Sequence, residues 1–234
     1  MTNIHPSSII GENVKIGSNV YIGPNCVIGF GNYHTPFSLL LNSEQAFQEV
    51  FIGDNTKIMG NAVICQGTII GDNNRIDYHS YLGENVKTGS FVDIKYRARI
   101  YNNVEIGNYT SISSFIANDC IVGNHCIVQG DLVHKFKDVT YGTPEPSPIV
   151  KDYAFIGMNS IVVGEVIIEE RSYIGASTVI TKSTNPCRLY IGSPAKDVGV
   201  APTPFSKGRH ENITLNVNPN NPQEIKKITT DRQI

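Results

Sequence analysis

The stretch IIGENVKIGSNVYIGPNCVIG, residues 9–29, decides the fold of this chain. In it an aliphatic residue followed by glycine recurs every six residues, at Ile10, Ile16, Ile22 and Ile28. An amphipathic helix would repeat apolar residues at spacings of three and four, and a half-buried strand at a spacing of two. A strict period of six fits neither pattern. It predicts a solenoid in which each hexad forms one short strand and one turn.

The same period runs through most of the chain. It returns at Ile52 and continues to Ile112, slips by four residues to Ile116, and resumes at Val150 after a longer break. Branched aliphatic side chains suit the strand of each hexad. Three hexads close one triangular coil, so we expect about eight coils stacked in a quasi-one-dimensional array with a continuous core.

Two further positions of the hexad agree with this model. Four residues after the aliphatic one, a side chain again points into the narrow prism and has to be small. The sequence has Val14, Val20, Cys26, Ala62, Thr68, Ser80, Ala98, Thr110, Cys120, Cys126, Ala154, Ser160 and Thr178 there. Three residues after the aliphatic one comes the turn, where Asn tolerates the left-handed backbone region. The Asn residues at this position are Asn13, Asn19, Asn25, Asn55, Asn61, Asn73, Asn85, Asn103 and Asn159.

The repeat is interrupted twice and ends before the chain does. Residues 30–50 and 134–149 are predicted to form insertions that project from corners of the prism. The predicted β-helix domain is therefore 1–198, followed by a C-terminal extension over 199–234. Irregular segments on a rigid scaffold commonly carry function. The two insertions are thus the expected specificity elements.

The position of each histidine in the hexad distinguishes turn residues from a candidate catalytic residue. His79 and His125 fall at the turn position, which His also tolerates. His134 stands six residues after Val128, at an inward position where burying an unpaired imidazole would cost a few kcal/mol. We therefore predict that the chain leaves the prism at His134, which becomes the candidate catalytic residue. Asp131 is predicted to hold an outward turn position, so it is a poor partner for His134.

The hexads, and above all the stretch SPIVKDYAFIGMNS…YIGSPAKDV over 147–198, resemble the hexapeptide-repeat acyltransferase superfamily. Within it the chain is similar to nucleotide-sugar N-acetyltransferases and to xenobiotic and galactoside-type O-acetyltransferases. The resemblance implies an all-β, left-handed parallel β-helix and a homotrimer with active sites at the subunit boundaries. It also implies acetyl-coenzyme A as the cosubstrate.

The resemblance assigns roles to individual residues. His134 matches the histidine that precedes an extended loop and deprotonates the acceptor, a role that suits a pKa near neutrality. Gly157, Gly175 and Ala176 match positions where the pantetheine approaches the backbone, and Lys182 and Lys196 match residues near the coenzyme phosphates. In the first insertion, Tyr33 and His34 are candidate substrate contacts.

Several function classes stay open at this point. N-acetylation of a nucleotide-linked amino sugar for surface polysaccharide is the leading interpretation. O-acetylation of a sugar or antibiotic and a non-catalytic scaffold are the alternatives. A zinc-dependent β-helix carbonic anhydrase is disfavoured because the sequence has no His-x4-His pair, and no metal is expected.

Composition narrows the partners. A net charge of −2 disfavours a nucleic-acid-binding surface, so a small-molecule acceptor is expected. No apolar run approaches the roughly 20 residues of a membrane span. The five cysteines are odd in number and lack CxxC spacing. With no export signal at the N-terminus, we expect a reduced cytoplasmic protein.

Overall fold

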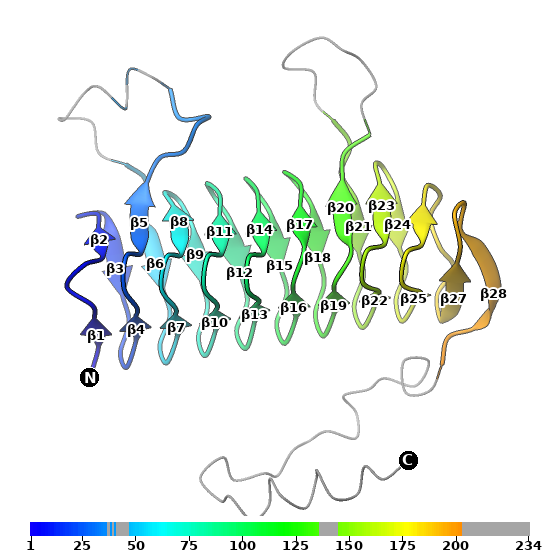
Figure 1. Ribbon diagram of the computed structural model, residues 1–234, viewed down its shortest axis with the longest axis horizontal. Helices are drawn as coiled ribbons and strands as arrows, with labels where there is room; N and C mark the ends of the chain where they lie inside the picture. Colours follow the sequence, from blue (N-terminus) through cyan, green and yellow to red (C-terminus); the bar gives the residue numbers. More distant parts are fainter. Residues whose placement is uncertain (37, 39, 41–46, 136–144, 203–234) are drawn as a thin grey trace, which may run out of the picture.

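The computed structural model describes residues 1–36, 38, 40, 47–135 and 145–202. It is an elongated three-sided stack of short strands that form three parallel sheets, A, B and C (Figure 1). Sheet A has eleven strands in the order β1 (Asn3–Ile4), β4 (Tyr21–Ile22), β7 (Lys57–Ile58), β10 (Arg75–Ile76), β13 (Asp93–Ile94), β16 (Ser111–Ile112), β19 (Ile127–Val128), β22 (Phe155–Ile156), β25 (Tyr173–Ile174), β27 (Arg188–Ile191) and β28 (Lys196–Val200). Sheet B has nine, β2 (Ile9–Ile10), β5 (Val27–Phe30), β8 (Val63–Cys65), β11 (Tyr81–Leu82), β14 (Arg99–Ile100), β17 (Phe115–Ile116), β20 (Asp131–Val133), β23 (Ile161–Val163) and β26 (Val179–Ile180). Sheet C has eight, β3 (Val14–Ile16), β6 (Val50–Ile52), β9 (Ile69–Ile70), β12 (Lys87–Thr88), β15 (Glu105–Ile106), β18 (Ile121–Val122), β21 (Ile149–Val150) and β24 (Ile167–Ile168).

The predicted hexad register is confirmed along most of the stack. Ile58 pairs with Ile76, and Ile76 with Ile94, so equivalent aliphatic residues lie directly above one another. All three are buried, as are the small residues at the second inward position, except the half-buried Val14. Eight turns have a strand in each sheet, and β25 to β27 extend the stack to about ten turns, slightly more than the eight expected.

One part of the register prediction is wrong. A second slip of four residues follows Val128, and Leu132 rather than His134 takes the inward position. Leu132 pairs with Ile116 on one side and Val162 on the other, and it is fully buried. His134 follows the last residue of β20 and is half-buried, so the burial of an imidazole is not why the chain leaves the prism.

The turn prediction is confirmed at eight of the nine asparagines. Asn73, for example, has a φ of 58°, in the left-handed region. Asn13 is the exception: its side-chain amide donates hydrogen bonds to the carbonyls of Gly29 and Gln48. His79 and His125 are turn residues with φ of 60° and 56°, as predicted. Phe91, Arg97, Tyr109, Asp119, Tyr153, Arg171, Ser177 and Cys187 also have positive φ.

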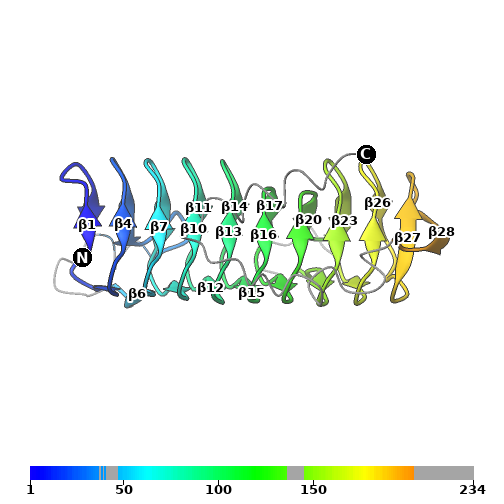
Figure 2. The same cartoon turned by 90° about the horizontal axis from the view of Figure 1, so that it is seen from below.

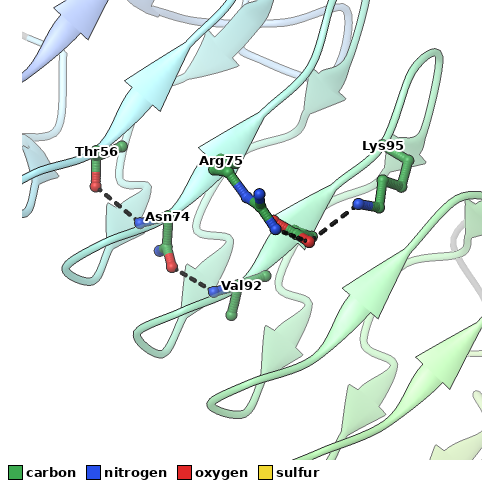
Figure 3. Close-up of polar contacts among 6 residues, drawn as sticks. Thr56, Asn74, Arg75, Val92 and Lys95 are labelled. Atoms are coloured by element: carbon green, nitrogen blue, oxygen red, sulfur yellow. Dashed lines mark hydrogen bonds and ion pairs between the residues drawn. The ribbon is translucent and has the colours of Figure 1, made fainter. Parts of the chain in front are cut away.

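One small inward position carries a polar amide whose bonding capacity is met. Asn74 is buried, and its side-chain oxygen accepts a hydrogen bond of 2.6 Å from the Val92 amide. Its side-chain nitrogen donates to Thr88 Oγ1 at 2.9 Å and to the Gly89 carbonyl at 2.8 Å. On the outer face of sheet A, Arg75 and Lys95 both bind the Asp93 carboxylate (Figure 3). A buried amide is tolerated here because each polar group has a partner.

Both insertions start from a strand of sheet B (Figure 1). The first follows β5 and the second follows β20, and four strands of sheet B separate these two. At the C-terminal end, β28 turns back antiparallel to β27 (Figure 2). The predicted boundary at 198 falls within β28. Of the predicted extension, residues 203–234 lie outside the described residues.

Candidate functional site

A pocket of about 380 Å³ lies at a corner of the prism and is lined by residues of both insertions. His34 from the first insertion and His134 from the second both contribute to it. The remaining lining residues come from the prism: Tyr101, Phe115, Ala117, Asn118 and Val133. Four strands of sheet B, at about 4.8 Å spacing, separate the strands that precede the two insertions. The described start of the first insertion therefore reaches along the prism as far as the pocket that His134 lines.

Each nitrogen atom of the His134 ring faces an oxygen atom of the protein, and Nε2 is held by a hydrogen bond. Nε2 lies 3.1 Å from the carbonyl oxygen of Asn118, and Nδ1 lies 3.7 Å from Glu145 Oε2. Because a carbonyl only accepts, Nε2 carries the hydrogen in this arrangement. In the neutral ring, Nδ1 is then the basic nitrogen. A proton taken up there would face the Glu145 carboxylate.

Glu145 is the residue that sequence reasoning missed. Its side chain is only 16% exposed, and its Oε2 makes no hydrogen bond. Such a carboxylate stabilises a nearby cation more strongly than an exposed one would. It lies in the loop outside the repeat, where register says nothing about position. No sequence signal marked it.

Asp131 is placed differently from the prediction. It is the first residue of β20 and not a turn residue. Its carboxylate accepts a hydrogen bond of 3.0 Å from the Phe115 amide. The outcome for its role is unchanged, because this bond engages Asp131 with the backbone of sheet B.

The base of the second insertion is tied to the Asn118 carbonyl. Ser147 Oγ donates to this oxygen at 2.6 Å, alongside His134. One backbone group thus holds both the start and the end of the insertion. Nearby, burial raises the pKa of the Cys120 thiol to about 12, so it stays protonated at neutral pH. The groups available for acid–base chemistry at this corner are therefore the His134 imidazole and the Glu145 carboxylate.

Aromatic side chains form the prism wall of the pocket. The rings of Tyr101 and Phe115 lie 5.1 Å apart at 60°, and Tyr81 packs 5.6 Å from Tyr101. The guanidinium of Arg99 lies 5.2 Å from the centre of the Phe115 ring, within cation–π range. A flat or amphipathic acceptor would find both apolar surface and hydrogen-bonding groups here.

The two predicted substrate contacts separate in the structure. His34 lines the pocket with His134. Tyr33 is 87% exposed and stands outside the lining, with its ring 4.7 Å from that of His34. The structure therefore brings His34 to the pocket, while Tyr33 packs on its outer side.

The predicted coenzyme residues lie on the C-terminal turns, away from the lining of this pocket. A Cβ on Gly157 would come within 2.6 Å of the Ala176 nitrogen, and one on Gly175 within 2.8 Å of Ile191. Stacking of successive turns thus suffices to explain both glycines. Ala176, Lys182 and Lys196 are exposed. Their coenzyme roles remain predictions.

Two features of other protein classes are absent from the described ranges. Within them, no three His, Cys, Asp or Glu side chains are grouped closely enough to hold a metal ion. Nor does any helix in that part of the chain have the length and apolar character needed to cross a membrane.

Comparison with known families identifies the repeat. Residues 147–182 match the bacterial transferase hexapeptide family, a model of six repeats. These 36 residues carry the six-residue repeat of that family. Residues 1–92 match the family of the GMPPB C-terminal domain. The two matches lie on either side of the turns that build the pocket.

Curated relatives match shorter stretches. The chain is 31% identical over 99 residues to the "Putative serine acetyltransferase" of Schizosaccharomyces pombe, which is 40% of this chain and 36% of the relative. It is 33% identical over 61 residues to the bifunctional protein GlmU of Rubrobacter xylanophilus, which is 26% of this chain and 13% of the relative. The chain thus spans about a third of the first relative's length and less of the second's.

Solved structures match over the whole stack. The UDP-N-acetylglucosamine acyltransferase of Francisella novicida superposes with a TM-score of 0.66 at 21% identity, covering 97% of this chain and 77% of that one. The enzyme of the same name from Campylobacter jejuni gives 0.63 at 20% identity, covering 85% and 75%. At these identities the likeness establishes the shared left-handed β-helix fold.

Proposed function

We propose that this hexapeptide-repeat protein is an acetyl-coenzyme A-dependent acyltransferase that N-acetylates a nucleotide-linked amino sugar. The observation that carries the proposal is the pairing of Glu145 with His134, which lines a pocket together with His34 of the first insertion. The relatives named as acetyltransferases support the reaction class, and the UDP-sugar acyltransferases of the same fold support the acceptor class.

The reaction would proceed by direct attack on the thioester. The amine nitrogen of the acceptor adds to the acetyl carbonyl carbon, and collapse of the tetrahedral intermediate breaks the carbon–sulfur bond. His134 Nδ1 takes the proton that the amine loses, and Glu145 stabilises the imidazolium. The coenzyme leaves as a thiolate, and the proton that His134 holds neutralises this thiolate.

The cosubstrate and assembly belong to the same proposal. Gly157, Gly175 and Ala176 would line the path of the pantetheine, and the exposed Lys182 and Lys196 would meet the phosphates. The active unit would be a homotrimer with this path between subunits. Mass measurement by light scattering tests it: three times 25.7 kDa supports the trimer, and a single chain mass contradicts it. The five free thiols support a reducing, cytoplasmic setting.

The decisive experiment measures thiol release from acetyl-coenzyme A against a panel of acceptors. The panel contains nucleotide-linked amino sugars, the same sugars with hydroxyl in place of amine, free sugars and aminoglycosides. Release with the linked amino sugars alone supports the proposal. Release with hydroxyl acceptors would instead establish O-acetylation. Silence over the panel, together with no acetyl-coenzyme A binding by calorimetry, would leave a scaffold role.

A further inference from the structure

Glu84 lies two residues after β11, and its carboxylate is the point at which the first insertion is attached to the prism. Oε1 accepts hydrogen bonds from the Asn32 amide at 3.0 Å and from Gln66 Nε2 at 3.1 Å, and also from Thr35 Oγ1. Two of these three donors belong to the insertion. The repeat itself does not require a carboxylate here, because the next two turns carry Asn102 and Asn118 at the equivalent position.

The same corner carries a chain of hydrogen bonds from one insertion to the other. Asn102 Oδ1 accepts from the Glu84 amide at 2.9 Å and from Asn32 Nδ2 at 2.8 Å. The Asn102 amide donates to Asn118 Oδ1 at 2.9 Å, and the Asn118 carbonyl binds His134. Asn102 and Asn118 thus connect Asn32, at the base of the first insertion, to the imidazole of the second.

The segment from Asn32 to Thr35 is short and is held by hydrogen bonds within itself. The His34 amide donates to Asn32 Oδ1 at 2.8 Å, and the Thr35 amide donates to the Asn32 carbonyl at 3.0 Å. Fixing Asn32 and Thr35 on Glu84 therefore fixes His34 between them. His34 is exposed, but its backbone has little freedom to move.

The charge of Glu84 suits this role. Burial opposes ionisation, but hydrogen bonds from Thr35, Asn32 and Gln66, with the nearby His34, outweigh it and lower the pKa of the Glu84 carboxyl. The group is ionised at neutral pH. Hydrogen bonds to an ionised acceptor are about twice as strong as those between neutral groups.

We propose that Glu84 is a positioning residue: it anchors residues 32–35 on the prism and thereby sets where His34 stands opposite His134. The part of this inference that concerns the acceptor rests on the proposed function. The anchoring itself does not. It predicts that loss of the carboxylate loosens the first insertion while the stack stays folded.

Residue-resolved hydrogen exchange on the full chain tests the anchoring without any substrate. In Glu84→Gln the amides of Asn32, His34 and Thr35 should exchange at least tenfold faster than in the wild type, with the Ile64 and Leu82 amides unchanged. Thr35→Val removes one donor without altering the prism and should give a smaller increase. Glu105→Gln is the matched control, because it breaks only the exposed ion pair with Lys87.

The exchange results decide whether Glu84 anchors residues 32–35 on the prism. Equal exchange of the three amides in Glu84→Gln and in Glu105→Gln would overturn it. If Glu84→Gln does not fold, the Thr35→Val result stands alone, and unchanged exchange there would overturn it as well. Neither outcome depends on whether acyl transfer is observed.

Kinetics test the consequence for the acceptor. In Glu84→Gln we expect the KM for the acceptor to rise about tenfold, with kcat and the KM for acetyl-coenzyme A changed less than twofold. A loosened insertion with an unchanged acceptor KM would show that Glu84 holds the segment but does not set the pocket. Failure to find any acceptor would count against the proposed function and leave the exchange result intact.

Discussion

His134 Nδ1 and Glu145 Oε2 lie 3.7 Å apart, one at the start of the second insertion and the other near its end. The distance is too long for a hydrogen bond and short enough for an ion pair once the ring is protonated. Nε2 is already engaged with the Asn118 carbonyl. A proton taken up at Nδ1 would therefore face the Glu145 carboxylate.

Replacing the imidazole tests whether this pair acts as a base. His134→Ala should lower kcat by about 10²–10⁴-fold, the range for loss of a general base. Glu145→Gln should lower kcat less, because the imidazole remains. The control His79→Asn changes a turn histidine remote from the pocket and should leave kcat unchanged. A loss smaller than about threefold in His134→Ala would mean that the amine attacks without a protein base.

The second slip of the repeat can be tested through stability. Leu132 is fully buried, so Leu132→Ala should lower the free energy of unfolding by about 2–5 kcal/mol. The neighbouring Val133 is half-buried, so Val133→Ala should cost clearly less. Urea unfolding of both variants gives the comparison. The assigned register would be wrong if the order of the two losses were reversed.

The left-handed turns predict a contrast at Asn73, whose φ is 58°. Asn73→Ala should lower the free energy of unfolding by about 1–2 kcal/mol, the cost of this backbone region for a residue with a Cβ. Asn73→Gly should cost less, since glycine adopts positive φ without strain. Thermal melting of the two variants measures the difference. Equal melting temperatures would contradict the backbone explanation.

Asp93 predicts a pH-dependent contribution to stability. Burial opposes its ionisation, but hydrogen bonds from Arg75 and Lys95 outweigh burial and hold the pKa of the Asp93 carboxyl below its ordinary value. A depressed native-state pKa contributes stability above the unfolded-state pKa of about 3.9, and this contribution is lost as the pH falls through the native-state pKa.

The measurement compares wild type with Asp93→Asn by urea unfolding from pH 7 to pH 2. At pH 7 the wild type should be more stable, by on the order of 0.5 kcal/mol, since Arg75 and Lys95 are largely exposed. The difference should shrink below about pH 4. A difference that stays constant or grows toward pH 2 would show that the ion pairs do not contribute.

The fold could be predicted from the sequence because three positions of each hexad meet separate physical demands. One hexad shows where this predictability ends. Its inward residues Ile94 and Ala98 are buried in the core, whereas Arg97 at the turn has a positive φ that no residue preference would have assigned to it. Aliphatic and small positions are restricted by packing. The exposed turn position accepts a wider range of residues.

The site could be predicted only in part. The six-residue period predicts the inward position for His134, but Leu132 occupies that position. The location of His134 at a pocket therefore follows from the resemblance and not from the period. Glu145 lies where the repeat breaks. Glu84 lies at a repeat position that permits any polar residue. Their roles depend on how the insertions fold back on the prism, and a period of six contains no information about that.

The reversal of β28 against β27 has a consequence for how copies of the chain meet. The last parallel strand of a solenoid sheet exposes an edge that can template another strand. Here that edge is covered by an antiparallel strand that opens with Lys196 and Asp197 and is bulged opposite Leu189 and Tyr190. Charge and irregularity on an outer strand discourage further pairing. The hairpin therefore protects this sheet from end-to-end growth into fibres.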